Sequence, residues 1–125
     1  MNIYEQAELE LATALGWSNV TLVEGIDLIR TPSLMGTHPN GKMFSDVPAY
    51  ARSPFQTATL IAEYELDITW TFDAVGHLQV SVYNSDFDPT VTEKVKDHMD
   101  KRRCVAYAVA KVVNLLVIAK KNVKS

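Results

Sequence analysis

The sequence has 125 residues, of which 47% are apolar, and a formal net charge of −3; this is the size and composition of one globular domain with a single core. A lone cysteine, Cys104, excludes an intramolecular disulfide, and the longest apolar run, residues 104–119, is too short for a membrane span of roughly 20 residues. With no signal-like N-terminus, we expect a single domain over residues 1–125 in a reducing cytoplasm.

The first predicted element is a helix over residues 3–15, because Ala7, Leu11 and Leu15 recur on one face. Gly16 ends this helix, and the tryptophan that follows it is expected to enter the core.

Two short strands are predicted next, at residues 20–23 and 26–30, on either side of a Glu-Gly pair. Residues 31–49 contain three prolines and two glycines with little periodicity, so we expect a long loop there.

The clearest local signal lies at Ser53. Its hydroxyl is placed to accept the backbone N–H of Gln56 while the Gln56 side chain reaches back, which is a capping box, and Pro54 suits the first helical position. A short central helix is therefore predicted, with apolar positions at helical spacing at Ala58, Ile61 and Ala62.

After Tyr64 the hydrophobic period changes from helical to two, which predicts an antiparallel hairpin around the turn at residues 74–77. The residues expected to point inward are Leu66, Ile68, Trp70, Phe72, Leu78, Val80 and Val82. The opposite face is polar and includes Thr69, Thr71, Gln79, Ser81 and Tyr83.

The last part of the chain predicts a turn at residues 86–89, an edge strand at residues 91–95 and a long apolar helix over residues 100–120. The expected fold class is α+β: a small antiparallel sheet packed with an N-terminal helix, a short central helix and a long C-terminal helix.

Charge is unevenly distributed: residues 1–93 carry 3 basic and 13 acidic side chains, whereas residues 94–125 carry 9 basic and 2 acidic ones. The densest basic block is Lys101-Arg102-Arg103, and such blocks attract phosphates. The alternative is a basic helix whose charges complement the acidic body or another subunit. No DNA-binding or RNA-binding pattern accompanies the block, so we do not expect nucleic-acid binding.

Catalytic patterns are weak. His38, His77 and His98 share no ligand spacing and are interpreted as polar surface residues, so no metal is expected. Cys104 is interpreted as a buried structural thiol, and no glycine-rich phosphate loop is present in the sequence. These observations predict a protein that is not an enzyme and needs no cofactor.

Three segments carry a family resemblance: residues 11–17 (LATALGW), residues 50–63 with the strand at 66–72, and residues 103–110 (RCVAYAVA). Together they resemble the phage ABA sandwich domain, and residues 53–64 also resemble the small NinX-like phage proteins. The resemblance implies a phage or prophage accessory protein, acting in the host bacterial cytoplasm, that is not an enzyme. Relatives of this domain include Thoeris anti-defence sponges, which oligomerise and sequester cyclic nucleotide immune signals without cleaving them.

A sponge would need guanidinium groups for phosphates, an aromatic face for a base and polar groups for ribose hydroxyls. On chemistry alone, the candidate ligand-binding residues for a cyclic nucleotide or an ADP-ribose-type ligand are Arg52, Tyr83, Asn84, Asp86, Arg102 and Arg103. Each has an ordinary alternative: solvated or ion-paired arginines, a tyrosine in a subunit contact, and strand-end and turn residues.

The polar strand face bears on assembly, because a sheet covered by helices on both faces would be apolar on both. Either helices cover the sheet on one side only, in two layers, or the polar face forms a subunit interface or a ligand cleft in a homo-oligomer; we expect the second. The alternative function is a phage protein that binds and inhibits a host protein through its acidic first two thirds.

Overall fold

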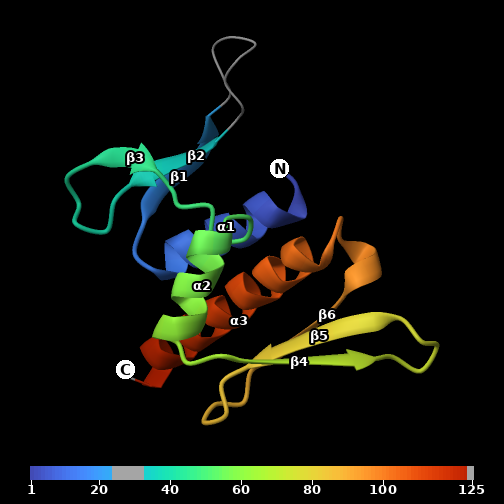
Figure 1. The fold of residues 1–125 in the computed structure, drawn as a ribbon. Helices are drawn as coiled ribbons and strands as arrows, with labels where there is room; N and C mark the ends of the chain where they lie inside the picture. The colour runs from blue at the N-terminus through green and yellow to red at the C-terminus, as the bar shows by residue number, and fades with distance from the viewer. Residues whose placement is uncertain (24–32, 124–125) are drawn as a thin grey trace.

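The computed structural model describes residues 1–23 and 33–123, which form three helices and two three-stranded antiparallel sheets (Figure 1). The predicted α+β class and the order of the three helices are confirmed, but two small sheets replace the expected one. The helices are α1 (Ile3–Ala14), α2 (Pro54–Glu63) and α3 (Lys101–Val123). The first sheet contains β1 (Ser18–Val23), β2 (Ser33–Thr37) and β3 (Phe44–Asp46), and the second contains β4 (Asp67–Phe72), β5 (Leu78–Tyr83) and β6 (Thr90–Lys94).

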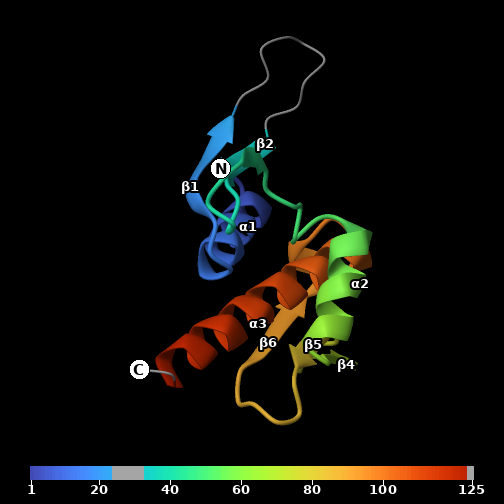
Figure 2. The same ribbon diagram turned by 90° about the vertical axis from the view of Figure 1, so that its left-hand side faces the viewer.

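Helix α3 is the centre of the fold. It packs against α1 on one side and against α2, β5 and β6 on the other, as Figure 2 shows. Its fully buried valines meet Leu11 of α1, Leu60 of α2 and Val80 of β5 in one core cluster. Within the described ranges, no helix combines the length and apolar character needed to cross a membrane.

Helix α1 is fixed at both ends. At its beginning, the Asn2 side chain accepts the Glu5 N–H (2.8 Å) and the Glu5 carboxylate accepts the Asn2 N–H (3.0 Å), a reciprocal capping box. At its end, the last turn of α1 contains no basic residue, but Lys121 of α3 donates to the carbonyl oxygen of Ala14. A cation at this end of a helix complements the helix dipole. The left-handed Gly16 (φ 104°) then turns the chain into β1.

The long loop predicted for residues 31–49 is wrong, because β2 and β3 lie within it; β2 pairs with β1, and β3 pairs with β2. The inward positions of β2 are Leu34 and Gly36, and a glycine adds nothing to a hydrophobic pattern. A Cβ atom on Gly36 would lie 2.9 Å from Cγ2 of Val20, so the close approach of β1 requires glycine there. The predicted strand at 20–23 lies within β1, and the one predicted at 26–30 lies outside the described residues.

Helix α2 begins at Pro54, as predicted, and the Ser53 hydroxyl accepts the Gln56 N–H at 3.5 Å. The reciprocal half of the predicted capping box is wrong, because the Ser53 N–H donates to the Ala49 carbonyl oxygen (2.9 Å) instead.

The predicted hairpin is confirmed as β4 and β5, and the predicted edge strand is β6, which pairs with β5. The inward residues Val80 and Val82 are fully buried, but the inward prediction is wrong for the end of β4, where Trp70 is 41% and Phe72 is 70% exposed. The end of this hairpin projects beyond the beginning of α3 (Figure 1).

Candidate functional site

A cleft of about 560 Å³ lies between α2, the first turns of α3 and strand β4. It brings together three of the six predicted residues, Arg52, Arg102 and Arg103. The other residues lining it are Pro54, Thr57, Ala58, Ile61, Trp70, Asp100, Lys101, Val105 and Ala106. The cleft therefore combines an apolar interior with a group of cationic side chains.

The cations lie at the beginning of α3. Asp100 caps this helix, since its carboxylate accepts the Arg103 N–H (2.8 Å) and its carbonyl oxygen accepts the Cys104 N–H (3.1 Å). The side chains of Lys101 and Arg102 are exposed, and neither forms an ion pair with another described residue. Positive side chains at this end of a helix add to the positive end of its dipole. This end of the cleft is therefore suited to an anion.

Arg52 has a structural partner that the sequence did not indicate. Its Nη2 and Nε atoms donate to the two carboxylate oxygens of Glu8 at 2.7 and 3.0 Å, and the Ala51 N–H donates to the same carboxylate (3.1 Å). The Glu8 side chain is 1% exposed. Hydrogen bonds to this carboxylate raise the pKa of Arg52 above its ordinary value. The interpretation of Arg52 as a solvated loop residue is therefore wrong, although a guanidinium has five N–H donors and Glu8 occupies only part of them.

Arg103 connects the cleft to a second cluster. Its guanidinium carbon lies 5.4 Å from the centre of the Tyr4 ring, a cation–π contact. The Tyr4 hydroxyl lies 2.7 Å from Nδ1 of His98, and Nε2 of His98 lies 2.9 Å from a carboxylate oxygen of Glu93. Burial raises the pKa of Tyr4. The cluster therefore joins α1, β6 and the beginning of α3.

The interpretation of His98 as a polar surface residue is wrong, because its side chain has no exposed surface. A hydroxyl, an imidazole and a carboxylate in series resemble a nucleophile, its base and an orienting acid. However, Tyr4 is only 9% exposed and does not line the cleft, so the geometry fits a structural network rather than a reaction centre.

Cys104 is a buried thiol, as predicted, with its sulfur 3.6 Å from the Glu93 carbonyl oxygen. Burial raises the pKa of this thiol to about 11. The predicted surface positions of His38 and His77 are confirmed. In the parts of the chain that the structure describes, no group of three or more acidic, His or Cys side chains could hold a metal ion.

The other three predicted residues lie elsewhere. Asn84 is 8% exposed, and its amide donates to the carbonyl oxygens of Tyr64 (2.8 Å) and Glu65 (3.4 Å) while it accepts the Asp86 N–H (2.8 Å). These bonds hold the left-handed Glu65 (φ 52°) between α2 and β4. Asn84 and Asp86 line a separate depression of about 400 Å³ beside residues 116 and 120 of α3. At 1.5 Å per residue, that part of α3 lies roughly 20 Å from the arginines.

Tyr83 lies on the polar face of the second sheet, where its hydroxyl is 3.2 Å from Oγ1 of Thr69. This is the face opposite Trp70, so Tyr83 does not approach the cleft. Trp70 supplies the aromatic surface in the cleft. This role was not predicted, because the alternation of Trp70 with threonines is typical of a core position in a strand.

Comparison of the chain with protein-family models, with curated proteins and with solved structures finds no match.

Proposed function

We propose that the cleft between α2, α3 and β4 binds a phosphate-bearing nucleotide and holds it without chemical change. The observation that carries the proposal is the position of the exposed Lys101 and Arg102 at the positive end of α3, beside an apolar cleft that contains the indole of Trp70.

The phosphates would lie against the first turn of α3, where helix N–H groups and cations act together. The base would lie against Trp70 and Ile61, because an indole offers a large flat surface for stacking. A volume of about 560 Å³ lies within the usual range of small-molecule sites.

Sequestration rather than catalysis is favoured by the lining of the cleft. Among the described residues that line it, Asp100 is the one carboxylate, and it is engaged in capping α3. The resemblance to phage ABA sandwich domains supports the same function: an anti-defence protein that removes a cyclic nucleotide or ADP-ribose-type signal in an infected cell.

A second candidate function is binding and inhibition of a host protein. It is favoured by three large apolar side chains near the cleft, Phe55, Phe72 and Met99, which are 74%, 70% and 80% exposed. Exposed apolar surface of this kind is typical of protein contact sites.

The test is equilibrium dialysis of the purified protein against extracts of cells with active nucleotide-signalling defences. The protein is then denatured and the released compounds are identified by mass spectrometry. We expect an intact nucleotide in stoichiometric amount. Release of cleaved products would identify an enzyme, and no nucleotide together with a stoichiometric host protein would support the second candidate.

The cleft itself is tested by Arg102→Ala, with Lys42→Ala as the control, because both remove one exposed cation and Lys42 lies in the turn between β2 and β3. Loss of a phosphate contact is expected to weaken binding of the identified nucleotide about tenfold or more, which corresponds to about 1.4 kcal/mol. The control is expected to bind like the parent chain. Equal binding by Arg102→Ala would show that the nucleotide binds elsewhere.

A further inference from the structure

Strand β4 is an edge strand whose second side is unpaired by any described residue. It pairs with β5 in regular register over its whole length. At the hairpin end the Asp73 N–H donates to the His77 carbonyl oxygen (2.9 Å), which sets the alternation of an antiparallel pair. The backbone groups of the odd-numbered residues of β4 therefore point to β5, and those of Ile68, Trp70 and Phe72 point to the free edge.

This edge lacks the features that usually prevent strand pairing. Residues 67–72 contain no lysine, no proline and no bulge, and Asp67 is the one charged residue in β4. Trp70 and Phe72, whose backbone groups are free, are also exposed apolar side chains. Both the backbone and the side chains of β4 are therefore available to a partner.

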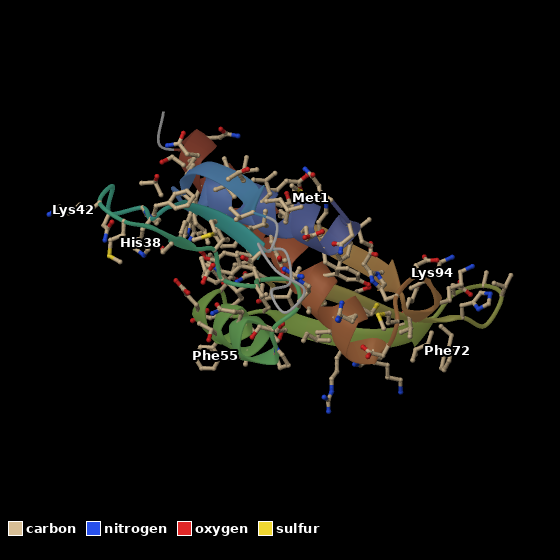
Figure 3. All side chains as sticks on the ribbon, turned by 90° about the horizontal axis from the view of Figure 1, so that it is seen from above. Met1, His38, Lys42, Phe55, Phe72 and Lys94 are labelled. Atoms are coloured by element: carbon tan, nitrogen blue, oxygen red, sulfur yellow. The ribbon has the colours of Figure 1, made fainter. Side chains whose placement is uncertain are left out.

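The neighbouring helix extends the same surface. The outer stripe of α2 is exposed, follows helical spacing and carries no charge. It consists of Phe55, Ala58, Thr59 and Ala62. Figures 1 and 2 place α2 and β4 on the same side of the molecule, and in Figure 3 Phe55 and Phe72 both project from that side. An uncharged helical stripe therefore lies beside an unpaired strand.

We propose that this surface, formed by the free edge of β4 and the outer stripe of α2, binds a second copy of the chain. A twofold axis perpendicular to the sheet, midway between Trp70 of one copy and Trp70 of the other, pairs the two β4 strands antiparallel. Each Trp70 then lies opposite Trp70 of the second copy, and Ile68 lies opposite Phe72. Every free backbone donor and acceptor of these three residues gains a partner.

The sequence of β4 is complementary to itself in this register. Such an axis keeps even-numbered residues of both copies on one face, so apolar side chains meet apolar ones and Thr69 meets Thr71 on the other face. Asp67 lies opposite Asp73 of the second copy, whose charge is balanced by Lys94 at 3.0 Å. A foreign strand would have to match the same alternation, whereas a second copy does so by symmetry.

The dimer contains one continuous six-stranded sheet, with both α2 helices on the same face and their uncharged stripes turned toward each other. Because Trp70 also lines the cleft, the second copy adds its own Trp70 and Phe72 to the apolar surface beside it. The interface lies on the strand edge and not on the polar face that carries Tyr83.

The first test is the mass of the full chain in solution, measured by light scattering and sedimentation over a wide concentration range. We expect twice the mass of one chain. Trp70→Lys, which places a cation on the edge, is expected to give a monomer with unchanged far-ultraviolet circular dichroism. The control is Val75→Lys, which makes the same change at a 76% exposed turn residue outside the pairing and is expected to remain a dimer. A monomeric parent chain, or a folded and dimeric Trp70→Lys variant, would overturn the proposal.

The second test needs no variant. Amide hydrogen exchange of the parent chain is expected to show protection at consecutive residues 68–72. A monomer would protect only the N–H groups of Thr69 and Thr71 and expose those of Ile68, Trp70 and Phe72. Fast exchange at the even-numbered positions would overturn the proposal whatever the measured mass, because any dimer would then use another surface.

Discussion

The ion pair between the buried Glu8 and Arg52 allows the contribution of one buried carboxylate's partner to the free energy of unfolding to be measured. In Arg52→Ala, the Glu8 carboxylate keeps the Ala51 N–H (3.1 Å) but loses both guanidinium bonds at 2.7 and 3.0 Å. In the parent chain the Glu8 side chain is 1% exposed, so its carboxylate depends on these protein donors. The variant therefore leaves an uncompensated charge between α1 and the beginning of α2.

Breaking a buried pair in this way costs about 3–5 kcal/mol. The Arg52 side chain is 31% exposed, and partial contact with water weakens the pair, so we expect the lower end, about 3 kcal/mol. A domain of this size is stabilised by roughly 5–15 kcal/mol in total. Replacing both residues by leucine leaves only the Ala51 N–H without its acceptor, at a cost of about 1–3 kcal/mol. The double variant should therefore be no less stable than Arg52→Ala alone.

The measurement is urea unfolding followed by circular dichroism, with the free energy of unfolding obtained from the midpoint and slope. The control is Lys111→Met, which breaks the ion pair of Lys111 with Glu10 on the exposed side of α1 (3.6 Å). Exposed pairs contribute at most about 1 kcal/mol. If Arg52→Ala costs no more than this control, the reasoning about the buried carboxylate is refuted.

Three further outcomes are expected. The pKa of Cys104 is raised to about 11, so the unfolded chain ionises its thiol at a lower pH than the folded chain does. The free energy of unfolding should therefore fall between about pH 9 and 11, and the urea midpoint of Cys104→Ser should fall less over the same range. The pKa of Asp73 is lowered to about 2, first by the His77 N–H and then by Lys94. The Asp73 carboxylate therefore stabilises the folded chain above about pH 4, and this stabilisation is lost as the pH falls toward 2. Asp73→Asn should remove this pH dependence from the free energy of unfolding, and an acid titration of stability like that of the parent chain would contradict the reasoning. Gly36→Ala places a Cβ atom 3.0 Å from the Ser18 carbonyl oxygen and should cost about 1–3 kcal/mol in urea unfolding, whereas parent-like stability would mean that β1 and β2 separate easily.

Much of the second half of the fold could be predicted from the sequence, because its signals are local. The proline at the first position of α2, the period of two in β5 and the apolar stripe of α3 each act within one element. In the first sheet only part of β1 was predicted, and β2 and β3 were not. Strand β2 places Gly36 against β1, and a glycine at an inward position adds no apolar side chain to the hydrophobic alternation by which a strand is predicted.

The candidate site was only partly predictable, for a related reason. A charged block identifies Arg102 and Arg103, but the burial of a side chain and its hydrogen-bond partners depend on elements distant in the sequence. Arg52 meets a carboxylate 44 positions earlier in the chain, and Asn84 bonds to backbone 20 positions away. Trp70 and Phe72 have the alternation of core residues, yet both are exposed: Trp70 lines the open cleft beside α2 and α3, and the end of the hairpin projects beyond the beginning of α3.

The hydrogen bond from Lys121 to the carbonyl oxygen of Ala14 joins positions 107 residues apart, and this has a consequence for synthesis on the ribosome. An isolated helix as short as α1 is only marginally stable in water. The last turn of α1 is translated 107 residues before the cation that completes it. We therefore expect the last turn of α1 to stay frayed in a growing chain until Lys121 has been added, and nascent chains that stop before Lys121 to be cut by proteases first near that turn.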